Sequence, residues 1–373
     1  MLLSVLLALT LHQAPLTTVA EQSGWTRTGR YAEVESLCRA FPQRYPGKVR
    51  CDTFGTTPEG RPMLALVASA DGTLTPAATA KKGRPVVLFQ GGIHSGEIDG
   101  KDAGFWLLRD LLDGKALPGV LKQVTAVFVP VFNVDGHERF GPNNRPNQVG
   151  PEEMGWRVTG QNLNLNRDYV KADAPEMVAL LKLLHTWNPL FYVDLHVTDG
   201  AKFEHDVSVQ LEPQKVGPET VRTLGAKLRE ELFTELEAKG HLPLPFYPSF
   251  RDNDDPASGV TYGVSPPRFS HQYWAAHRRY GVLVETHSWK PYAHRVATTR
   301  HVLEGLLRLT ARDGQALLSA VKASDTEATS GKVRDVVLIW DNTEKHRPFA
   351  FRGYAYERTP SELTTQPWIR YDD

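Results

Sequence analysis

Apolar residues along the chain alternate between short continuous runs and longer stretches with helical spacing. Four runs are short and apolar enough to be buried strands, at residues 85–92, 125–132, 190–197 and 280–287. Amphipathic helical patterns separate or follow them, at residues 98–114, 174–187, 217–240 and 291–323. Buried strands that alternate with such helices predict an α/β fold, in which a mixed, mostly parallel sheet is sandwiched by helices.

The two ends of the chain differ from this central body. Residues 1–20 begin with a short apolar run, Leu2 to Leu11, and end in the small residues Thr18-Val19-Ala20, which is the pattern of a secretory signal peptide. The segment has no Lys or Arg before the apolar run, so a buried N-terminal element is the alternative. Residues 331–373 lose the helical period, and we expect a β-rich appendage there, incomplete at its C-terminal end. Residues 21–330 are then the main domain, and the chemistry considered below falls within it.

Composition excludes several classes of partner. Forty-three basic residues balance forty-three acidic ones among 373 residues, so bulk charge does not favour a polyanion, and no nucleic-acid partner is expected. The N-terminal run is too short to span a bilayer and no later stretch is a transmembrane candidate, so we expect no stable membrane insertion. A monomer is expected.

The chain has two cysteines, Cys38 and Cys51. Cys38 lies in a helical pattern at residues 30–41, and a strand is expected soon after it. In an exported protein such a pair forms a disulfide, whereas in a cytosolic one it would be two buried thiols. The signal segment favours the first interpretation, and with it a secreted or periplasmic location.

Four polar residues lie at the ends of the buried strands or shortly after them. His94 and Glu97 come after the strand at 85–92, His196 ends the strand at 190–197, and Glu285 ends the strand at 280–287. Ligands of open α/β sheets gather beyond the carboxyl ends of the strands, so these four side chains should converge there. His301 and Glu304 have the same spacing as His94 and Glu97, but they lie inside a helical pattern where neighbours on a solvated face need no metal.

Two histidines and a glutamate form a known hydrolytic zinc site, which leaves a fourth position open for water. His94 and Glu97 in a glycine-flanked turn can reach one ion together, and His196 can reach it from a second strand end. The sequence therefore predicts that His94, Glu97 and His196 bind zinc.

The chain resembles the zinc carboxypeptidases of the M14, or funnelin, family. The resemblance rests on GGIHSGE, VFNVDGHERF, GWR with NLNLNR, DLH and LVETHS in that order, and it covers roughly residues 85–290. It implies an eight-stranded mixed sheet and one zinc ion per chain, held by His94, Glu97 and His196. Glu285 matches the carboxylate that takes a proton from zinc-bound water and returns it to the leaving amine.

The resemblance also implies how the substrate is held. Arg157 matches the arginine that stabilises the developing oxyanion, while Asn166 and Arg167 match the pair that binds the terminal carboxylate. Tyr262 and Tyr273 are the two candidates for the family's mobile tyrosine, and core or surface packing is the alternative for each.

One position departs from the family pattern. Family members often carry an aspartate two residues before the clamp asparagine, where it orients a zinc-bound histidine, and this chain has Asn164 there. The amide oxygen can still accept the imidazole proton, but without a full negative charge. Asp194, on the same strand face as His196, is a candidate for the missing carboxylate.

The function that follows is hydrolysis of C-terminal peptide bonds by a zinc-dependent metallocarboxypeptidase, with C-termini of peptides or proteins as substrates. A related zinc amidase or deacylase, acting on cell-wall peptides or N-acyl amino acids, is the alternative. A binding module without catalysis is the third possibility, and the presence of Glu285 beside three metal ligands argues against it.

Overall fold

An eight-stranded sheet forms the centre of the protein. The structure is a computed structural model that describes residues 16–253, 255–331, 333, 335, 337–364 and 367–372. The order across the sheet is β1-β2-β4-β3-β5-β10-β6-β7. The strands are β1 (Val49–Thr56), β2 (Pro62–Ala68), β3 (Val86–Gln90), β4 (Thr125–Val129), β5 (Phe191–Val197), β6 (Val207–Glu212), β7 (Pro243–Leu244) and β10 (Tyr280–Thr286).

The middle of this sheet is parallel. β4, β3, β5 and β10 run in one direction, and β2 and β6 flank them in antiparallel pairing. Every residue of β3, β4, β5 and β10 is buried, as expected for strands covered on both faces. In the register of β5 and β10, His196 pairs with Glu285. The predicted α/β fold with a mixed sheet is therefore confirmed, and it brings a candidate metal ligand beside the candidate base.

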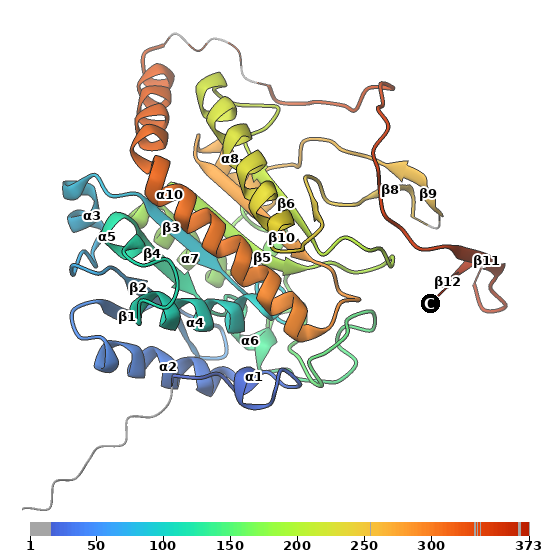
Figure 1. Cartoon of the computed structure of the whole chain (residues 1–373), viewed down its shortest axis with the longest axis horizontal. Coiled ribbons are helices and arrows are strands. Elements are labelled where there is room, and N and C mark those ends of the chain that lie inside the picture. Colours follow the sequence, from blue (N-terminus) through green and yellow to red (C-terminus); the bar gives the residue numbers. More distant parts are fainter. Residues whose placement is uncertain are drawn as a thin grey trace, which may run out of the picture.

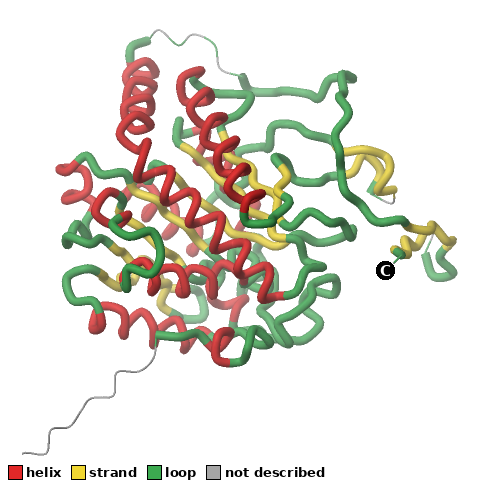
Figure 2. The backbone as a smooth tube through the Cα atoms, viewed as in Figure 1, coloured by secondary structure: helices red, strands yellow, loops and turns green. Residues whose placement is uncertain are grey.

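Helices cover the sheet on both faces. In Figure 1, α4, α8 and α10 lie in front of the sheet and α7 lies behind it, and the tube of Figure 2 shows the same layers. The helices are α1 (Val19–Gln22), α2 (Tyr31–Arg44), α3 (Pro76–Lys82), α4 (Asp99–Leu112), α5 (Val120–Gln123), α6 (Val134–His137), α7 (Pro175–Trp187), α8 (Glu219–Ala238), α9 (Ser270–Ala276) and α10 (Tyr292–Thr329). A short 3-10 turn covers Leu165–Arg167.

Several parts of the described structure were not anticipated from the pattern of apolar residues. The strand β6 is as buried as its neighbours, although residues 207–212 contain alternating polar side chains. Residues 71–84, which have the composition of a loop, include the helix α3, because Thr75 caps its first turn and Pro76 begins it. The small hairpin of β8 (Phe250–Asp252) and β9 (Asp255–Val260) is a separate two-stranded sheet.

The structure agrees only in part with the predictions for the two ends of the chain. Residues 1–15 of the predicted signal peptide lie outside the described residues, while Thr18 and Ala20 are buried and Thr18 caps α1. A cut after Ala20 would therefore remove packed side chains. At the other end, β11 (Tyr356–Pro360) and β12 (Pro367–Tyr371) form a hairpin, but residues 337–340 form no strand. The division into domains at residues 20 and 330 stays a prediction.

The disulfide predicted between Cys38 and Cys51 is present and links α2 to β1, with the two Cα atoms 5.4 Å apart. Among the described helices, none combines the length and the hydropathy that a membrane span requires.

Candidate metallopeptidase site

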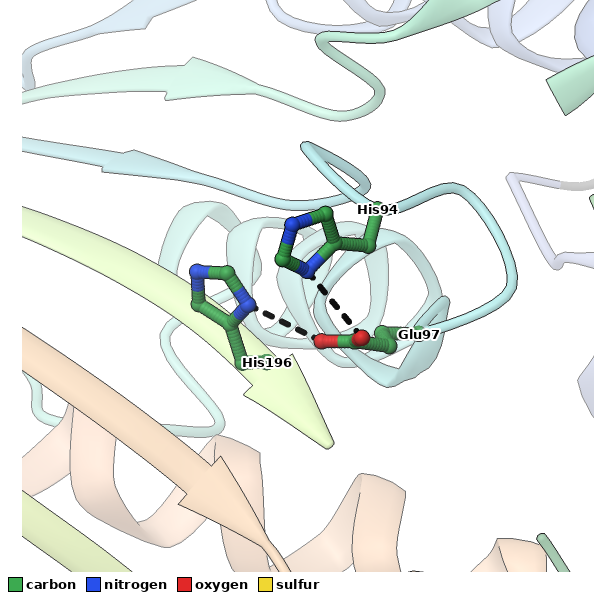
Figure 3. A group of neighbouring side chains, drawn as sticks. All are labelled: His94, Glu97 and His196. Carbon is green, nitrogen blue, oxygen red and sulfur yellow. Dashed lines mark hydrogen bonds and ion pairs between the residues drawn. The ribbon is translucent and has the colours of Figure 1, made fainter. Parts of the chain in front are cut away.

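His94, Glu97 and His196 meet at the carboxyl ends of β3 and β5, as Figure 3 shows. The Nδ1 atom of His94 lies 3.1 Å from one carboxylate oxygen of Glu97, and the Nδ1 atom of His196 lies 2.9 Å from the other. All three side chains are buried, and one candidate ligand atom from each lies within 4.8 Å of the others. The structure thus brings together the three residues predicted to bind zinc.

Glycines shape the turn that presents His94 and Glu97. A Cβ atom on Gly91 would lie 2.8 Å from the carbonyl oxygen of Pro130, and Gly92 has a positive φ of 63°. Neither position would accept a larger residue without strain. A Cβ atom on Gly96 would lie 2.7 Å from the Cγ atom of Arg145, so this glycine lets that arginine approach the turn.

Each histidine is oriented through its second ring nitrogen. The Nε2 atom of His94 lies 3.2 Å from Oδ1 of Asn164, and that of His196 lies 2.8 Å from Oδ2 of Asp194. Both Nδ1 atoms are thereby turned towards Glu97. The buried Nδ1 atom of His94 makes no hydrogen bond within the described structure. Two oriented imidazoles with a carboxylate between them, and acceptors behind them, fit a zinc ion.

Two arginines contact the same oxygen of Glu97. Arg145 donates to it at 2.9 Å and Arg157 at 3.0 Å. Arg145 also donates to the carbonyl oxygens of Val197 and Thr198, so it ties the turn after β3 to the end of β5. Burial alone would raise the pKa of Glu97, but His94 and Arg145 bring it well below its usual range. Glu97 is therefore held as a carboxylate. Arg145 was missed in the sequence because it lies in a loop with no recognisable motif.

Glu285 lies beside this group at the end of β10. Burial raises the pKa of its carboxyl group to about 8, with His196 opposing that rise and Glu97 adding to it. The ordinary structural partners for Glu285 would be the neighbouring arginines, but Arg278 donates to Ser324 and Arg279 pairs with Asp325. Neither arginine neutralises Glu285.

A cavity of about 510 Å³ opens in front of these residues. Its walls include seven of the predicted site residues, which are His94, Glu97, Arg157, Asn166, Arg167, Tyr262 and Glu285. His196 is buried beside Glu97 and does not line it. Tyr273 is also outside the lining, because it lies on α9 with its hydroxyl 3.3 Å from the Nε2 atom of His185. The structure does not bring Tyr273 to the site.

Comparison with known proteins agrees with this geometry. Residues 34–214 match the family model described as zinc carboxypeptidase, of the M14 peptidases. This region is an M14 zinc carboxypeptidase domain. Mouse carboxypeptidase A4 is 29% identical to the chain over 141 residues, which are 36% of this chain and 31% of the mouse protein. The chain thus matches less than a third of the length of that curated relative.

Solved structures of carboxypeptidases share the fold. A metallo-carboxypeptidase from Burkholderia cenocepacia has a TM-score of 0.53 at 17% sequence identity, covering 76% of this chain and 69% of that one. The carboxypeptidase A from Helicoverpa armigera has a TM-score of 0.52 at 14% identity, covering 77% of this chain and 74% of that one. At these identities the likeness establishes the fold alone.

Two further residues line the cavity without having been singled out in the sequence. Tyr247 lies close enough to Glu285 and Asp199 that, after burial, their charges raise the pKa of its hydroxyl well above the usual range. His271 is buried, and neither of its ring nitrogens has a hydrogen-bond partner in the described structure. The chain has twelve tyrosines and thirteen histidines, so no local pattern marked these two.

Arginines make one part of the cavity electropositive. Burial lowers the pKa of Arg167, and the positive charges of Arg157 and Arg268 lower it further. The Arg167 guanidinium stacks 4.4 Å above the ring of Phe269 and donates to the carbonyl oxygen of Asn166. The side chain of Asn166 points from the same turn towards Ser270 and His196. A fixed guanidinium group beside a second one favours a bound anion.

Proposed function

We propose that this protein is a zinc-dependent metallocarboxypeptidase that hydrolyses the C-terminal peptide bond of peptides and proteins. The observation that carries the proposal is the composition of the cavity beside these residues. Its walls combine two of the three candidate metal ligands and Glu285 with the guanidinium groups of Arg157 and Arg167. Hydrolysis of a C-terminal bond needs these groups together, because the reacting carbonyl and the terminal carboxylate lie one residue apart in the substrate.

His94, Glu97 and His196 would hold one catalytic zinc ion, which supplies an acidified water molecule and polarises the scissile carbonyl group. Asn164 and Asp194 keep the two imidazoles in the tautomer whose Nδ1 atom is free to bind the metal. Arg145 holds the Glu97 carboxylate in place by its bonds to two strand-end carbonyl oxygens.

Glu285 is the proposed general base and acid. Its carboxylate lies beside the metal-binding group, it lines the cavity, and its raised pKa suits a group that takes up a proton and releases it again. Arg157 would donate to the oxyanion that forms on the scissile carbonyl, and its present contact with Glu97 leaves its side chain one-third exposed to the cavity.

Asn166 and Arg167 are the proposed partners of the terminal carboxylate, with Arg167 held against Phe269. Tyr262 is kept as a candidate that closes over the substrate. Its hydroxyl donates to Gln214, and burial raises the pKa of Tyr262 to about 12, so it would act as a neutral hydrogen-bond donor.

The test is hydrolysis of one peptide in two forms, with a free and with an amidated C-terminus, by the zinc-loaded full chain. We expect cleavage of the free peptide only, and a loss of kcat of roughly a hundred-fold to ten-thousand-fold in Glu285→Gln. Glu304→Gln is the matched control, because Glu304 belongs to the other His-x-x-Glu pair and is bonded to Arg300 on α10. Equal cleavage of the amidated peptide would overturn the proposed carboxypeptidase activity.

We also propose an exported location and a monomer. The disulfide between Cys38 and Cys51 supports an oxidising compartment, such as the periplasm or the extracellular space.

A further inference from the structure

A second group of imidazole and carboxylate side chains lies outside the cavity. Asp206 directly precedes β6, His241 follows α8, and His294 lies in the first turn of α10. One candidate ligand atom from each residue lies within 4.8 Å of the other two. The three residues come from three segments of the chain, and none of them is used in the proposed peptidase mechanism. We call them the Asp206 cluster.

The spacing of the Asp206 cluster is close to that of a bound zinc ion. The Nε2 atom of His294 lies 2.7 Å from Oδ1 of Asp206, and the Nδ1 atom of His241 lies 3.8 Å from Oδ2. Ligand atoms about 2 Å from a tetrahedral zinc ion are separated from one another by about 3.3 Å. The described distances fall on either side of this value, so small rotations of the side chains would suffice.

The surroundings hold two of the three ligands in place. Oδ2 of Asp206 accepts a hydrogen bond from the backbone nitrogen of Leu242 at 2.8 Å. The Nε2 atom of His241 lies 2.8 Å from Nδ1 of His301, which orients the ring with Nδ1 towards Asp206. A histidine that binds a metal is usually fixed in this way through its other nitrogen.

A cation can reach the Asp206 cluster from solvent. Asp206 and His241 are buried, but the His294 side chain is 39% exposed. Lys290 lies 3.7 Å from Oδ1 of Asp206 and is partly exposed, so it can move into solvent when a metal ion takes up the carboxylate charge. Two imidazoles and one carboxylate favour zinc and similar transition metals over magnesium or calcium, which prefer oxygen ligands.

We propose that Asp206, His241 and His294 form a second zinc site, which joins the segment before β6, the loop after α8 and the start of α10. Zinc there stabilises the packing of these three segments. The site would be independent of the peptidase activity proposed for the cavity.

The experiment uses the untagged full chain with His94→Ala and His196→Ala, in which the candidate peptidase metal site has lost both of its imidazole ligands. After equilibrium dialysis against micromolar zinc, elemental analysis should find about one zinc ion per chain. Adding His294→Ala should weaken zinc binding at least tenfold. Adding His277→Ala instead should leave it unchanged, because His277 is an exposed histidine at the end of α9.

A second measurement guards against a variant that fails to fold. In the chain with an intact cavity, His294→Ala should lower the zinc content by one ion per chain while the protein keeps a cooperative thermal unfolding transition. Absence of zinc from the His94→Ala, His196→Ala protein, or binding that survives His294→Ala, would overturn the second site. Neither outcome would bear on the peptidase proposal, which is tested by hydrolysis.

Discussion

The three candidate zinc ligands His94, Glu97 and His196, which we call the His94 triad, contain the same donors as the Asp206 cluster, two imidazoles and one carboxylate, in different surroundings. His94, Glu97 and His196 are buried at strand ends beside a cavity that also holds Glu285 and two guanidinium groups. The Asp206 cluster is built on helix and loop segments, with one partly exposed histidine and with Lys290 and His301 as neighbours. Under the two proposals, the donor set selects the metal at both sites, whereas the surrounding groups decide whether chemistry can follow.

The largest expected effect is a loss of peptidase activity that occurs on substitution at one site and not at the other. His196→Ala should lower kcat/KM by about a thousand-fold or more, because the activated water and the polarised carbonyl group are both lost. His294→Ala should leave kcat/KM within about twofold, because it lies outside the cavity. Both variants are measured on the free peptide with zinc in excess. A large loss in His294→Ala would show that the two sites are not independent.

The side chains that orient the candidate histidine ligands should affect zinc affinity at one site each. Asp194→Asn removes the carboxylate that orients His196. We therefore expect zinc to bind to the His94 triad roughly ten- to a hundred-fold more weakly. His301→Ala should weaken zinc binding only at the Asp206 cluster, through His241. Competition with a zinc chelator measures both affinities. Equal losses at both sites in either variant would contradict the assignment of these partners.

The pH dependence of kcat/KM should be set by Glu285 in the cavity and not by the Asp206 cluster. Glu285 accepts a proton only as a carboxylate, so kcat/KM should be highest above its pKa and fall about tenfold per pH unit below it. Burial sets this pKa at about 8 in the described structure, and a bound cation would lower it, so the acid limb should lie below pH 8. The limb should be the same in His294→Ala. A profile without an acid limb would argue against Glu285 as the base.

Much of the fold and of the His94 triad could be predicted because the sequence patterns that indicate them are local. The runs of apolar residues at β3, β4, β5 and β10 are long enough to identify each strand, and the polar residues that end them must meet at one edge. His94 and Glu97 lie three residues apart between glycines, which a single short segment displays. The strand β6 was missed because its polar residues interrupt the apolar run, although its position beside β10 buries all of it.

Residues that act through long-range contacts left no such signal. Arg145 reaches Glu97 from a loop 48 residues away in the sequence. It packs against Gly96, and nothing in the sequence around that glycine indicates this contact. His241 and His294 meet because α8 and α10 pack against each other. Tyr273 was a candidate from the family resemblance, but its helix turns it towards His185. Tertiary packing decided these positions, and sequence spacing could not.

The smallest expected effect concerns the one departure from the family pattern. Oδ1 of Asn164 accepts from His94 as a neutral amide, 3.2 Å from Nε2, and Asp194 already supplies a full charge behind His196. Asn164→Asp should therefore strengthen zinc binding to the His94 triad by only a few-fold, because it makes His94 more basic. The chelator competition should show this gain in the triad and no change at the Asp206 cluster. A loss of affinity would contradict the role given to charge behind His94, because Asn164→Asp keeps an oxygen that can accept from the backbone nitrogen of Asn166.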